Sequence, residues 1–199
     1  MNSVFILSGL GTLSLLAEIF NFRKILFPVI ILGLLTVVGI LVLEWDSSIA
    51  YFNNMLLFDN YAIAFSAGLS SIGLLWFLMS KDYFQEHTHV TVHFALIIFS
   101  LIGGVFMVSY NNLSMLFLGI EILSIPLYVL AGSKMKDLSS NEAAFKYFLM
   151  GAFATGFLLF GIALIYGVTG SFSLDRISEV IVNNDSELGG LLYVGILMM

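Results

Sequence analysis

A carboxylate in the middle of an apolar run is the residue best placed to do chemistry. Glu121 is the ninth residue of Leu113–Ala131, a run close to the roughly 20 residues that a helix needs to cross a bilayer. A charged side chain at that depth costs several kcal/mol unless it is paired, hydrated or protonated. We therefore expect Glu121 to take up and release protons. A static buried ion pair, or a protonated group that only donates a hydrogen bond, is the structural alternative.

Further polar side chains share the helical face of Glu121. Ser114 lies seven residues before it, Ser124 three residues after it and Tyr128 seven residues after it. These spacings return to one face of a helix. Lipid offers such groups no hydrogen-bond partner. We expect this polar stripe, defined as Ser114, Glu121, Ser124 and Tyr128, to face other helices or a wet cavity.

Lys146 is a second ionisable residue inside an apolar run, near one end of Ala143–Tyr166. Glu142 precedes it by four residues, which is the favourable order and spacing for an ion pair on one helix face. The spacing favours a lysine that reaches the membrane interface beside Glu142, and a part in a proton path is the alternative. Further along the run, Ala152 and Gly156 form a small-residue pair that predicts close helix packing.

The composition requires membrane-crossing helices to hold these residues. Hydrophobic residues make up 60% of the 199 residues and charged residues 10%, against about 25% charged in a typical soluble domain. Long unbroken apolar runs favour helices over the alternating strands of a barrel. The predicted fold class is therefore all-α, a polytopic transmembrane helical bundle. We expect six complete spans, roughly Val4–Phe20, Ile25–Leu43, Tyr61–Met79, Val90–Ser109, Leu113–Ala131 and Ala143–Tyr166.

A seventh apolar run begins near Leu188 and reaches Met199. It is too short to cross a bilayer, so we expect the chain to be a fragment of a longer protein.

Basic residues gather in every second connection between the expected spans. The five in these connections are Arg23, Lys24, Lys81, Lys134 and Lys136, whereas the other connections hold Arg176 alone. By the positive-inside rule, the N-terminus lies outside and the five basic residues lie in the cytoplasm.

The opposite connections are acidic. Their acids are Glu44, Asp46, Asp59, Asp175, Glu179, Asp185 and Glu187. A solvated outer surface accounts for them without a binding partner. On this side the segment Phe172–Val182 is too polar to span a membrane, and it carries Leu174, Ile177 and Ile181 on one helical face. It predicts either a short interfacial helix or an ordinary amphipathic connection.

Several other kinds of site lack the residues they need. Without cysteine the chain has no disulfide, no thiolate ligand for an iron–sulfur cluster and no cysteine nucleophile. His89 and His93 have the spacing of a metal pair and His87 lies near them, but no third ligand of matching quality is evident. We therefore expect no metal site. The sequence also contains no glycine-rich phosphate loop and no basic nucleic-acid patch.

Two sequence blocks resemble a known family. Residues 111–131, NNLSMLFLGIEILSIPLYVLA, are similar to the fifth-helix motif of the N-type antiporter-like subunit of respiratory complex I, NADH:quinone oxidoreductase subunit N. Residues 140–171, SNEAAFKYFLMGAFATGFLLFGIALIYGVTGS, resemble the block that follows this motif in the family. The likeness is strong over these two blocks and rests mainly on hydropathy over residues 1–90.

The resemblance implies a larger fold built on inverted helical repeats. Residues 1–89 would hold three N-terminal helices, and residues 90–199 would be the first, truncated part of the proton-translocating repeat. Glu121 would be the essential membrane glutamate and Lys146 a lysine on the proton path that acts on Glu121 electrostatically. The lysine partner of Glu121 would lie beyond Met199.

The function implied by the resemblance is that of a multi-pass, proton-translocating subunit in the bacterial inner membrane. It would belong to an NADH (or related donor):quinone oxidoreductase and would carry no cofactor itself. Flavin, iron–sulfur clusters and quinone would be held by other subunits, and the sibling antiporter-like subunits would be its membrane partners. A subunit of a multisubunit cation/proton antiporter and a non-catalytic membrane scaffold are the alternatives. The midplane glutamate argues against a scaffold, which needs no such costly residue.

The charge asymmetry makes the topology testable. Cysteines introduced at Ser47 and at Lys136 should react with a membrane-impermeant maleimide from opposite sides of the membrane, because an odd number of spans separates them. The natural chain has no cysteine to give a background signal. Reaction of both positions from the same side would contradict the six-span topology.

Overall fold

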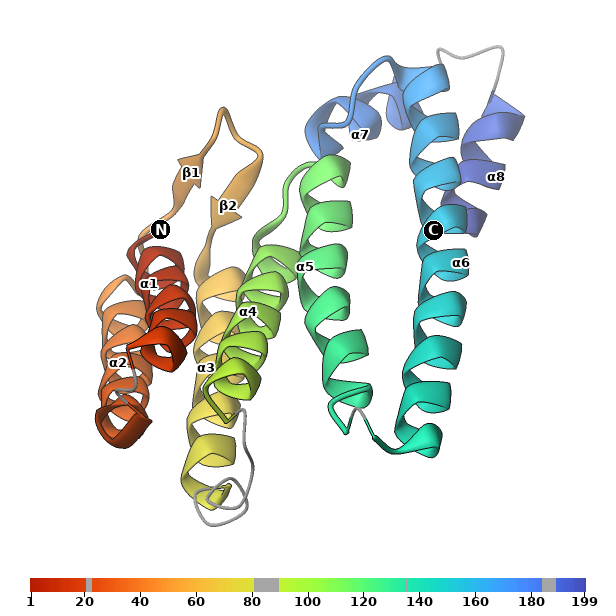
Figure 1. Cartoon of the computed structure of the whole chain (residues 1–199). Helices are drawn as coiled ribbons and strands as arrows, with labels where there is room; N and C mark the ends of the chain where they lie inside the picture. The colour runs from red at the N-terminus through yellow and green to blue at the C-terminus, as the bar shows by residue number, and fades with distance from the viewer. Residues whose placement is uncertain (21–22, 81–89, 135, 184–188) are drawn as a thin grey trace.

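The computed structural model describes residues 1–20, 23–80, 90–134, 136–183 and 189–199. Within them the chain forms eight helices and one two-stranded hairpin (Figure 1). The helices are α1 (Asn2–Ile19), α2 (Arg23–Leu43), α3 (Asn60–Met79), α4 (Val90–Ser109), α5 (Leu113–Ala131), α6 (Leu138–Thr169), α7 (Leu174–Asn183) and α8 (Gly189–Met198). Lys81, His87, His89, Asp185 and Glu187, which entered the sequence predictions, lie outside the described residues.

Six helices, α1 to α6, are long and apolar enough to cross a membrane. The predicted helical bundle with six complete spans is therefore confirmed. α8 is a shorter apolar helix where the sequence predicted the start of a seventh run. The segment Phe172–Val182, left open between a helix and a connection, forms α7, and its Ile177 is buried.

Short polar side chains cap the N-termini of the two helices that carry the candidate residues. Asn112 is the N-cap of α5, and its side-chain oxygen accepts a hydrogen bond from the backbone N–H of Ser114 at 2.9 Å. Asp137 is the N-cap of α6, and its carboxylate accepts a hydrogen bond from the backbone N–H of Ser139 at 3.1 Å. Both caps satisfy backbone donors that have no partner within the helix. α6 ends at Gly170, whose φ of +67° is readily adopted by glycine.

α6 is longer than its apolar run. The sequence predicted a span over Ala143–Tyr166, whereas the helix covers Leu138–Thr169 and has 32 residues. At 1.5 Å per residue it is ~48 Å long, against about 30 Å for the hydrocarbon core of a bilayer. Hydropathy misses the first turn because Ser139–Glu142 is polar, although these residues continue the helix.

Helices α1 to α4 form a bundle around one shared core. α1 packs against α2 and α4, and α3 packs against the same two helices. The core consists of apolar side chains at helical spacing, such as the fully buried Leu34, Val37 and Leu41 of α2. We call α1–α4 the N-terminal bundle.

α5 joins this bundle through a close backbone contact with α4. A side chain at Gly103 would collide with the backbone nitrogen of Leu123 and the carbonyl oxygen of Gly119. A side chain at Gly119 would in turn lie 3.0 Å from the backbone nitrogen of Met107. Small residues allow membrane helices to approach in this way. The contact fixes which face of α5 is turned to the N-terminal bundle.

A β-hairpin at one end of the molecule adds a detail that the sequence did not predict. β1 (Ile49–Tyr51) pairs antiparallel with β2 (Leu56–Phe58). Phe52, Asn53 and Asn54 in its turn have φ between +52° and +64°, a region that asparagine tolerates better than most residues. Strands of three residues are too short to leave a readable alternation in the sequence.

A polar cluster, defined as Asn54, Asn111 and Asp175, connects the hairpin to the rest of this end. Asn54 Nδ2 donates a hydrogen bond to Asp175 Oδ2 at 3.0 Å, and Asn111 Nδ2 donates to the same oxygen at 3.3 Å. The backbone N–H of Asn111 also donates to the carbonyl of Met55 at 2.9 Å. The cluster therefore links the hairpin, the α4–α5 turn and α7.

α8 packs against α6 through glycines. A side chain at Gly161 would lie 2.6 Å from the carbonyl oxygen of Gly195, and one at Gly195 would lie 3.0 Å from that of Gly161. The sequence predicted Ala152 and Gly156 for such a contact. Ala152 is exposed, and a side chain at Gly156 would meet none of the described atoms within 4 Å. The described helices make their close contact one or two turns further along α6.

The α4–α5 contact gives a stability prediction. Gly103→Ala should lower the free energy of unfolding by about 1–3 kcal/mol, because two backbones would have to move apart. For Gly104→Ala the nearest atoms belong to the flexible side chains of Leu69, at 3.1 Å, and Leu123, at 3.7 Å, so this change should cost less. Gly39→Ala, with no atom within 4 Å, is the neutral control. Thermal unfolding of the purified protein in detergent measures all three, and equal Tm values for Gly103→Ala and Gly39→Ala would contradict the close contact.

Candidate functional site

Glu121 lies in the middle of α5 and is half-buried. Phe117, four residues earlier, packs against a cluster that includes Leu158 and Ile162 of α6. Tyr128, seven residues later, contacts aromatic rings of α6. Residues at these spacings share one helical face. Glu121 therefore lies on the side of α5 that is turned to α6, between two points of contact.

Tyr128 forms the second of these contacts. Its ring lies edge-on to the rings of Tyr147 and Phe148, with centroid separations of 4.8 and 5.8 Å. Such geometry is favourable for aromatic pairs. The Tyr128 hydroxyl occupies the place where Gly151 would carry a side chain. Tyr128 thus holds α5 against α6 and brings a hydroxyl group to the α6 backbone.

The other members of the polar stripe, Ser114 and Ser124, are half-buried like Glu121. The stripe thus borders α6 on a partly open face of α5 and is not sealed in the protein interior. Among the described residues, no hydrogen bond or ion pair joins the Glu121 carboxylate to another group. The described part of the chain therefore supplies no partner for the static ion pair that was the structural alternative.

Lys146 forms the ion pair that its spacing predicted. Its ammonium lies 2.5 Å from Oε1 of Glu142, and the two side chains are 68% and 64% exposed. An exposed pair of this kind contributes at most about 0.5 kcal/mol to stability. Lys146 lies eight residues, or ~12 Å, from the start of α6. This placement fits a lysine that reaches the membrane interface.

The structure does not bring Lys146 and Glu121 together. α5 and α6 run antiparallel, with Tyr128 opposite Phe148 and Gly151. Glu121 lies seven residues from Tyr128 in one direction along the axis, and Lys146 lies two to five residues from the facing α6 positions in the other. At 1.5 Å per residue, the two groups are separated by roughly 13–18 Å along the helices. Lys146 is therefore no direct ion-pair partner of Glu121.

Pro126 lies inside α5, five residues after Glu121, and is buried. The helix nevertheless continues to Ala131. Because proline has no N–H, the carbonyl of Ile122 lacks its partner within the helix. Glu121 is thus followed directly by a backbone acceptor that is free to bond another donor.

A second carboxylate, Glu18, lies near the end of the membrane-spanning helix α1, and no sequence pattern marked it for a function. In the structure, the hydroxyl of Thr91 donates a hydrogen bond to Glu18 and so links α1 to α4. Thr91 is 1% exposed. Threonine is too common in apolar spans for Thr91 to stand out in the sequence. Its pairing with Glu18 joins two different helices, and only the structure shows that the two residues lie close together.

No group of three or more His, Asp or Glu side chains in the described ranges could hold a metal ion. His93 is half-buried, and the two other histidines of the predicted cluster lie outside these ranges. The absence of a metal site stays a prediction.

Comparison with known proteins adds a family to this geometry. Residues 110–199 match the family model described as NADH:quinone oxidoreductase/Mrp antiporter, TM. The chain is 46% identical over its whole length to a Flavobacterium psychrophilum protein named NADH-quinone oxidoreductase subunit N. It is 42% identical, again over its whole length, to the protein of that name from Cytophaga hutchinsonii. The chain spans 44% and 43% of the lengths of these two relatives.

Solved structures agree with this assignment. The chain superposes on a chain of respiratory complex I from Thermus thermophilus with a TM-score of 0.74 and 26% identity, covering 97% of this chain and 42% of the other. It also superposes on a chain of the archaeal membrane-bound sulfane sulfur reductase with a TM-score of 0.80. That match has 18% identity, covers 100% of this chain and 43% of the other, and so shows a shared fold alone.

The two blocks that suggested the family lie in α5 and α6, and the matched relatives extend the likeness to the N-terminal bundle. With six helices able to span a membrane, the chain is a multi-pass membrane protein that belongs to the NADH-quinone oxidoreductase subunit N family.

Proposed function

We propose that this protein is a proton-translocating membrane subunit of an NADH (or related donor):quinone oxidoreductase, and that Glu121 is its proton-carrying residue. One observation carries the assignment. A half-buried carboxylate lies at the middle of a membrane-spanning helix, on the side turned to the next helix, and has no partner among the described groups. Intramembrane acids in such positions are costly and mark proton relays. The names of the relatives support the same activity.

The surroundings of Glu121 suit a relay of several short steps. The carboxyl group can hold a proton, and the Tyr128 hydroxyl, seven residues along the same face, can both donate and accept a hydrogen bond. The carbonyl freed by Pro126 adds an acceptor within one residue of Glu121. Water entering between α5 and α6 would join these groups. This chain's own part of the reaction is thus to hold and pass a proton at the membrane centre.

Lys146 acts in this proposal as a distant charge and not as an ion-pair partner. Two unit charges 4 Å apart interact by about 4 kcal/mol at an effective dielectric of 20, whereas at ~15 Å the value falls to about 1 kcal/mol. In this proposal, the stronger interaction with Glu121 at about 4 Å would come from a cation outside these 199 residues. Lys146, with Glu142, would stand at the end of the proton path near the membrane surface.

The orientation proposed here follows the charges. The α5–α6 connection with Lys134 and Lys136 lies at the end opposite the hairpin and α7 (Figure 1). The hairpin end carries Asp46 and Asp175. By the positive-inside rule the basic end faces the cytoplasm of a bacterial inner membrane and the N-terminus lies outside.

The division of labour with other subunits is also part of the proposal. Flavin, iron–sulfur clusters and quinone would belong to other subunits, and this chain would contact the sibling antiporter-like subunits. Residues 1–89 would form an N-terminal region and residues 90–199 the first part of the proton-translocating repeat. The family match over residues 110–199 supports a repeat that includes α5, α6 and α8.

A subunit of a multisubunit cation/proton antiporter is the second candidate, because the family description names both classes. The identity of 46% to a relative named NADH-quinone oxidoreductase subunit N favours the oxidoreductase. The two functions differ in their energy source. Proton transport that requires electron donor and quinone supports the first, and transport driven by a sodium gradient alone supports the second.

Glu121→Gln in the intact complex should reduce proton pumping by roughly tenfold or more, because glutamine keeps the size of glutamate but has no transferable proton. Formation of ΔpH in vesicles, started by donor and quinone, is the measurement, and complex assembly is checked on the same sample. Glu179→Gln makes the same chemical change at an exposed position on α7 and should pump normally. Normal ΔpH in an assembled Glu121→Gln complex would refute the proposed role.

Lys146 gives a separate prediction. Lys146→Ala should cause a partial loss of pumping, smaller than that of Glu121→Gln, whereas Lys146→Arg should keep most of it because the positive charge remains. Lys136→Ala, at an exposed position on the same end of the molecule, is the control. The same ΔpH assay compares the three. Equal pumping by the Ala and Arg variants would show that the charge of Lys146 has no part in the path.

A further inference from the structure

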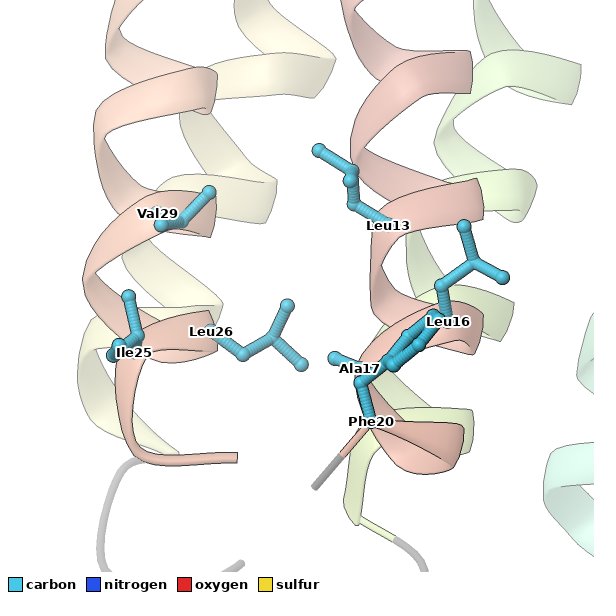
Figure 2. Close-up of a pocket in the computed structure, with 7 residues that line it drawn as sticks. All are labelled: Leu13, Leu16, Ala17, Phe20, Ile25, Leu26 and Val29. Atoms are coloured by element: carbon cyan, nitrogen blue, oxygen red, sulfur yellow. The ribbon is translucent and has the colours of Figure 1, made fainter. Parts of the chain in front are cut away.

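An apolar groove of about 460 Å³ opens between α1 and α2 (Figure 2). The seven side chains that line it are all apolar, so a proton has no side chain there to bind. The interface between α5 and α6 differs in this respect. Besides the polar stripe of α5, it includes a hydroxyl group of α6, that of Thr155.

Thr155 lies on the face of α6 that is turned to α5. Four residues earlier, Gly151 makes room for the Tyr128 hydroxyl of α5. Three residues later, Leu158 is buried in the cluster against which Phe117 of α5 packs. Residues at these spacings share one helical face. Thr155 is therefore turned to α5, between two points where the helices meet.

The exposure of this part of α6 agrees with the placement. Thr155 is half-buried, whereas residues 152–154 before it and residues 156–157 after it are exposed. A single covered position among exposed neighbours indicates a side chain that faces another element of the protein. The Thr155 hydroxyl thus belongs to the interface and not to the lipid-facing side of α6.

The antiparallel register of the two helices brings Thr155 close to the level of Ser124. Tyr128 lies opposite Gly151. From this contact, Thr155 is four residues along α6 and Ser124 is four residues along α5 in the same direction, about 6 Å in each helix. Glu121 follows ~4.5 Å beyond Ser124. Along the helix axes, Thr155 is thus level with Ser124 and about one turn from Glu121.

The hydroxyl groups of Thr155 and Ser124 are available to further partners. Thr155 Oγ1 donates to the carbonyl of Ala152 at 3.3 Å, which is long for an O–H···O hydrogen bond. By comparison, the hydroxyls of Thr36 and Thr169 donate to carbonyls of their own helices at 2.7 and 2.8 Å. Among the described residues, no hydrogen bond engages the Ser124 side chain. Since a hydroxyl group can donate one hydrogen bond and accept two, both can bind water between α5 and α6.

From this placement we propose that Thr155 is a positioning residue of the proton path, which together with Ser124 holds water beside Glu121. The inference rests on the proposed function of Glu121 and adds to it a residue of the second helix. Glu121 and Tyr128 are seven residues apart on α5, or ~10 Å, which is too far for a direct hydrogen bond. Water bound at the level of Ser124 and Thr155 lies between them and divides the transfer into shorter steps.

A purely structural threonine is the alternative. A threonine hydroxyl that bonds the preceding turn of its own helix needs no further partner and can bend the helix slightly. In that case the hydroxyl serves α6 alone, and its loss changes the stability of the helix without changing proton transfer.

The test compares ΔpH formation by variants of the intact complex in vesicles, with assembly checked on the same samples. Thr155→Val keeps the shape of threonine without the hydroxyl and should lower pumping by roughly threefold to tenfold, the effect of losing one hydrogen bond. Thr155→Ser keeps the hydroxyl and should pump at close to the natural rate. Thr155→Ala also lacks the hydroxyl and fits any space that threonine fills, so it repeats the test if valine disturbs the packing.

Thr36→Val is the matched control. Thr36 is an exposed threonine of α2, and its hydroxyl also donates to a carbonyl three residues earlier in its own helix. The same chemical change is therefore made far from Glu121, and pumping should stay normal.

Infrared difference spectroscopy between acidic and alkaline buffer gives a readout that does not depend on pumping. The C=O stretching band of protonated Glu121 is the band that Glu121→Gln removes. Hydrogen bonding lowers the frequency of this stretch. Thr155→Val should therefore move the band to higher frequency, whereas Thr155→Ser and Thr36→Val should leave it in place.

The outcomes separate this inference from the proposed function. Normal pumping by Glu121→Gln would refute both. Loss of pumping by Glu121→Gln, with Thr155→Val equal to Thr36→Val and an unshifted band, would leave the role of Glu121 in place and overturn that of Thr155. Pumping by Thr155→Ser as low as that of Thr155→Val would show that the hydroxyl is not what matters and would also overturn the inference.

Discussion

The absence of water inside a bilayer is the constraint on which this structure depends. It makes each spanning helix satisfy its own backbone and turns polar side chains toward other helices. Tyr128 meets α6 and Thr91 bonds Glu18 across the bundle. Glu121 shares the α6 side of α5 without a described partner. Among the described groups, a carboxylate at the middle of α5 is therefore left available for a proton, which is the property the proposed function requires.

Two unlike contacts join the N-terminal bundle to the helices that carry the candidate residues. Inside the membrane region, Gly103 and Gly119 bring the backbones of α4 and α5 together, so the orientation of α5 depends on glycine. At the acidic end, Asp175 accepts hydrogen bonds from Asn54 and Asn111 and links α7 to the hairpin and to the α4–α5 turn. The first contact sets the direction of the polar stripe, and the second fixes the end of α6 through α7.

Local sequence patterns predicted the helices and the Glu142–Lys146 pair because each depends on residues within a few turns. They did not predict which small residues of α6 meet another helix, because this depends on where α8 packs. α8 contacts α6 at Gly161 and not at Ala152. The sequence also could not predict the distance between Glu121 and Lys146, because this distance depends on which residues of α5 and α6 face each other. The hairpin has no pattern of sufficient length. The span predicted from hydropathy also left out the first turn of α6, because that turn is polar.

The length of α6 has a consequence for the membrane around it. A helix of ~48 Å in a hydrocarbon layer of about 30 Å must tilt, thicken the layer locally or project beyond it. The ion pair of Glu142 and Lys146 limits these choices, since its exposed charges favour a place in the headgroup region. Hydrophobic mismatch thus couples bilayer thickness to the tilt of α6, and through Tyr128 to the spacing beside Glu121. The acyl-chain length of the host membrane becomes a physical variable of the site.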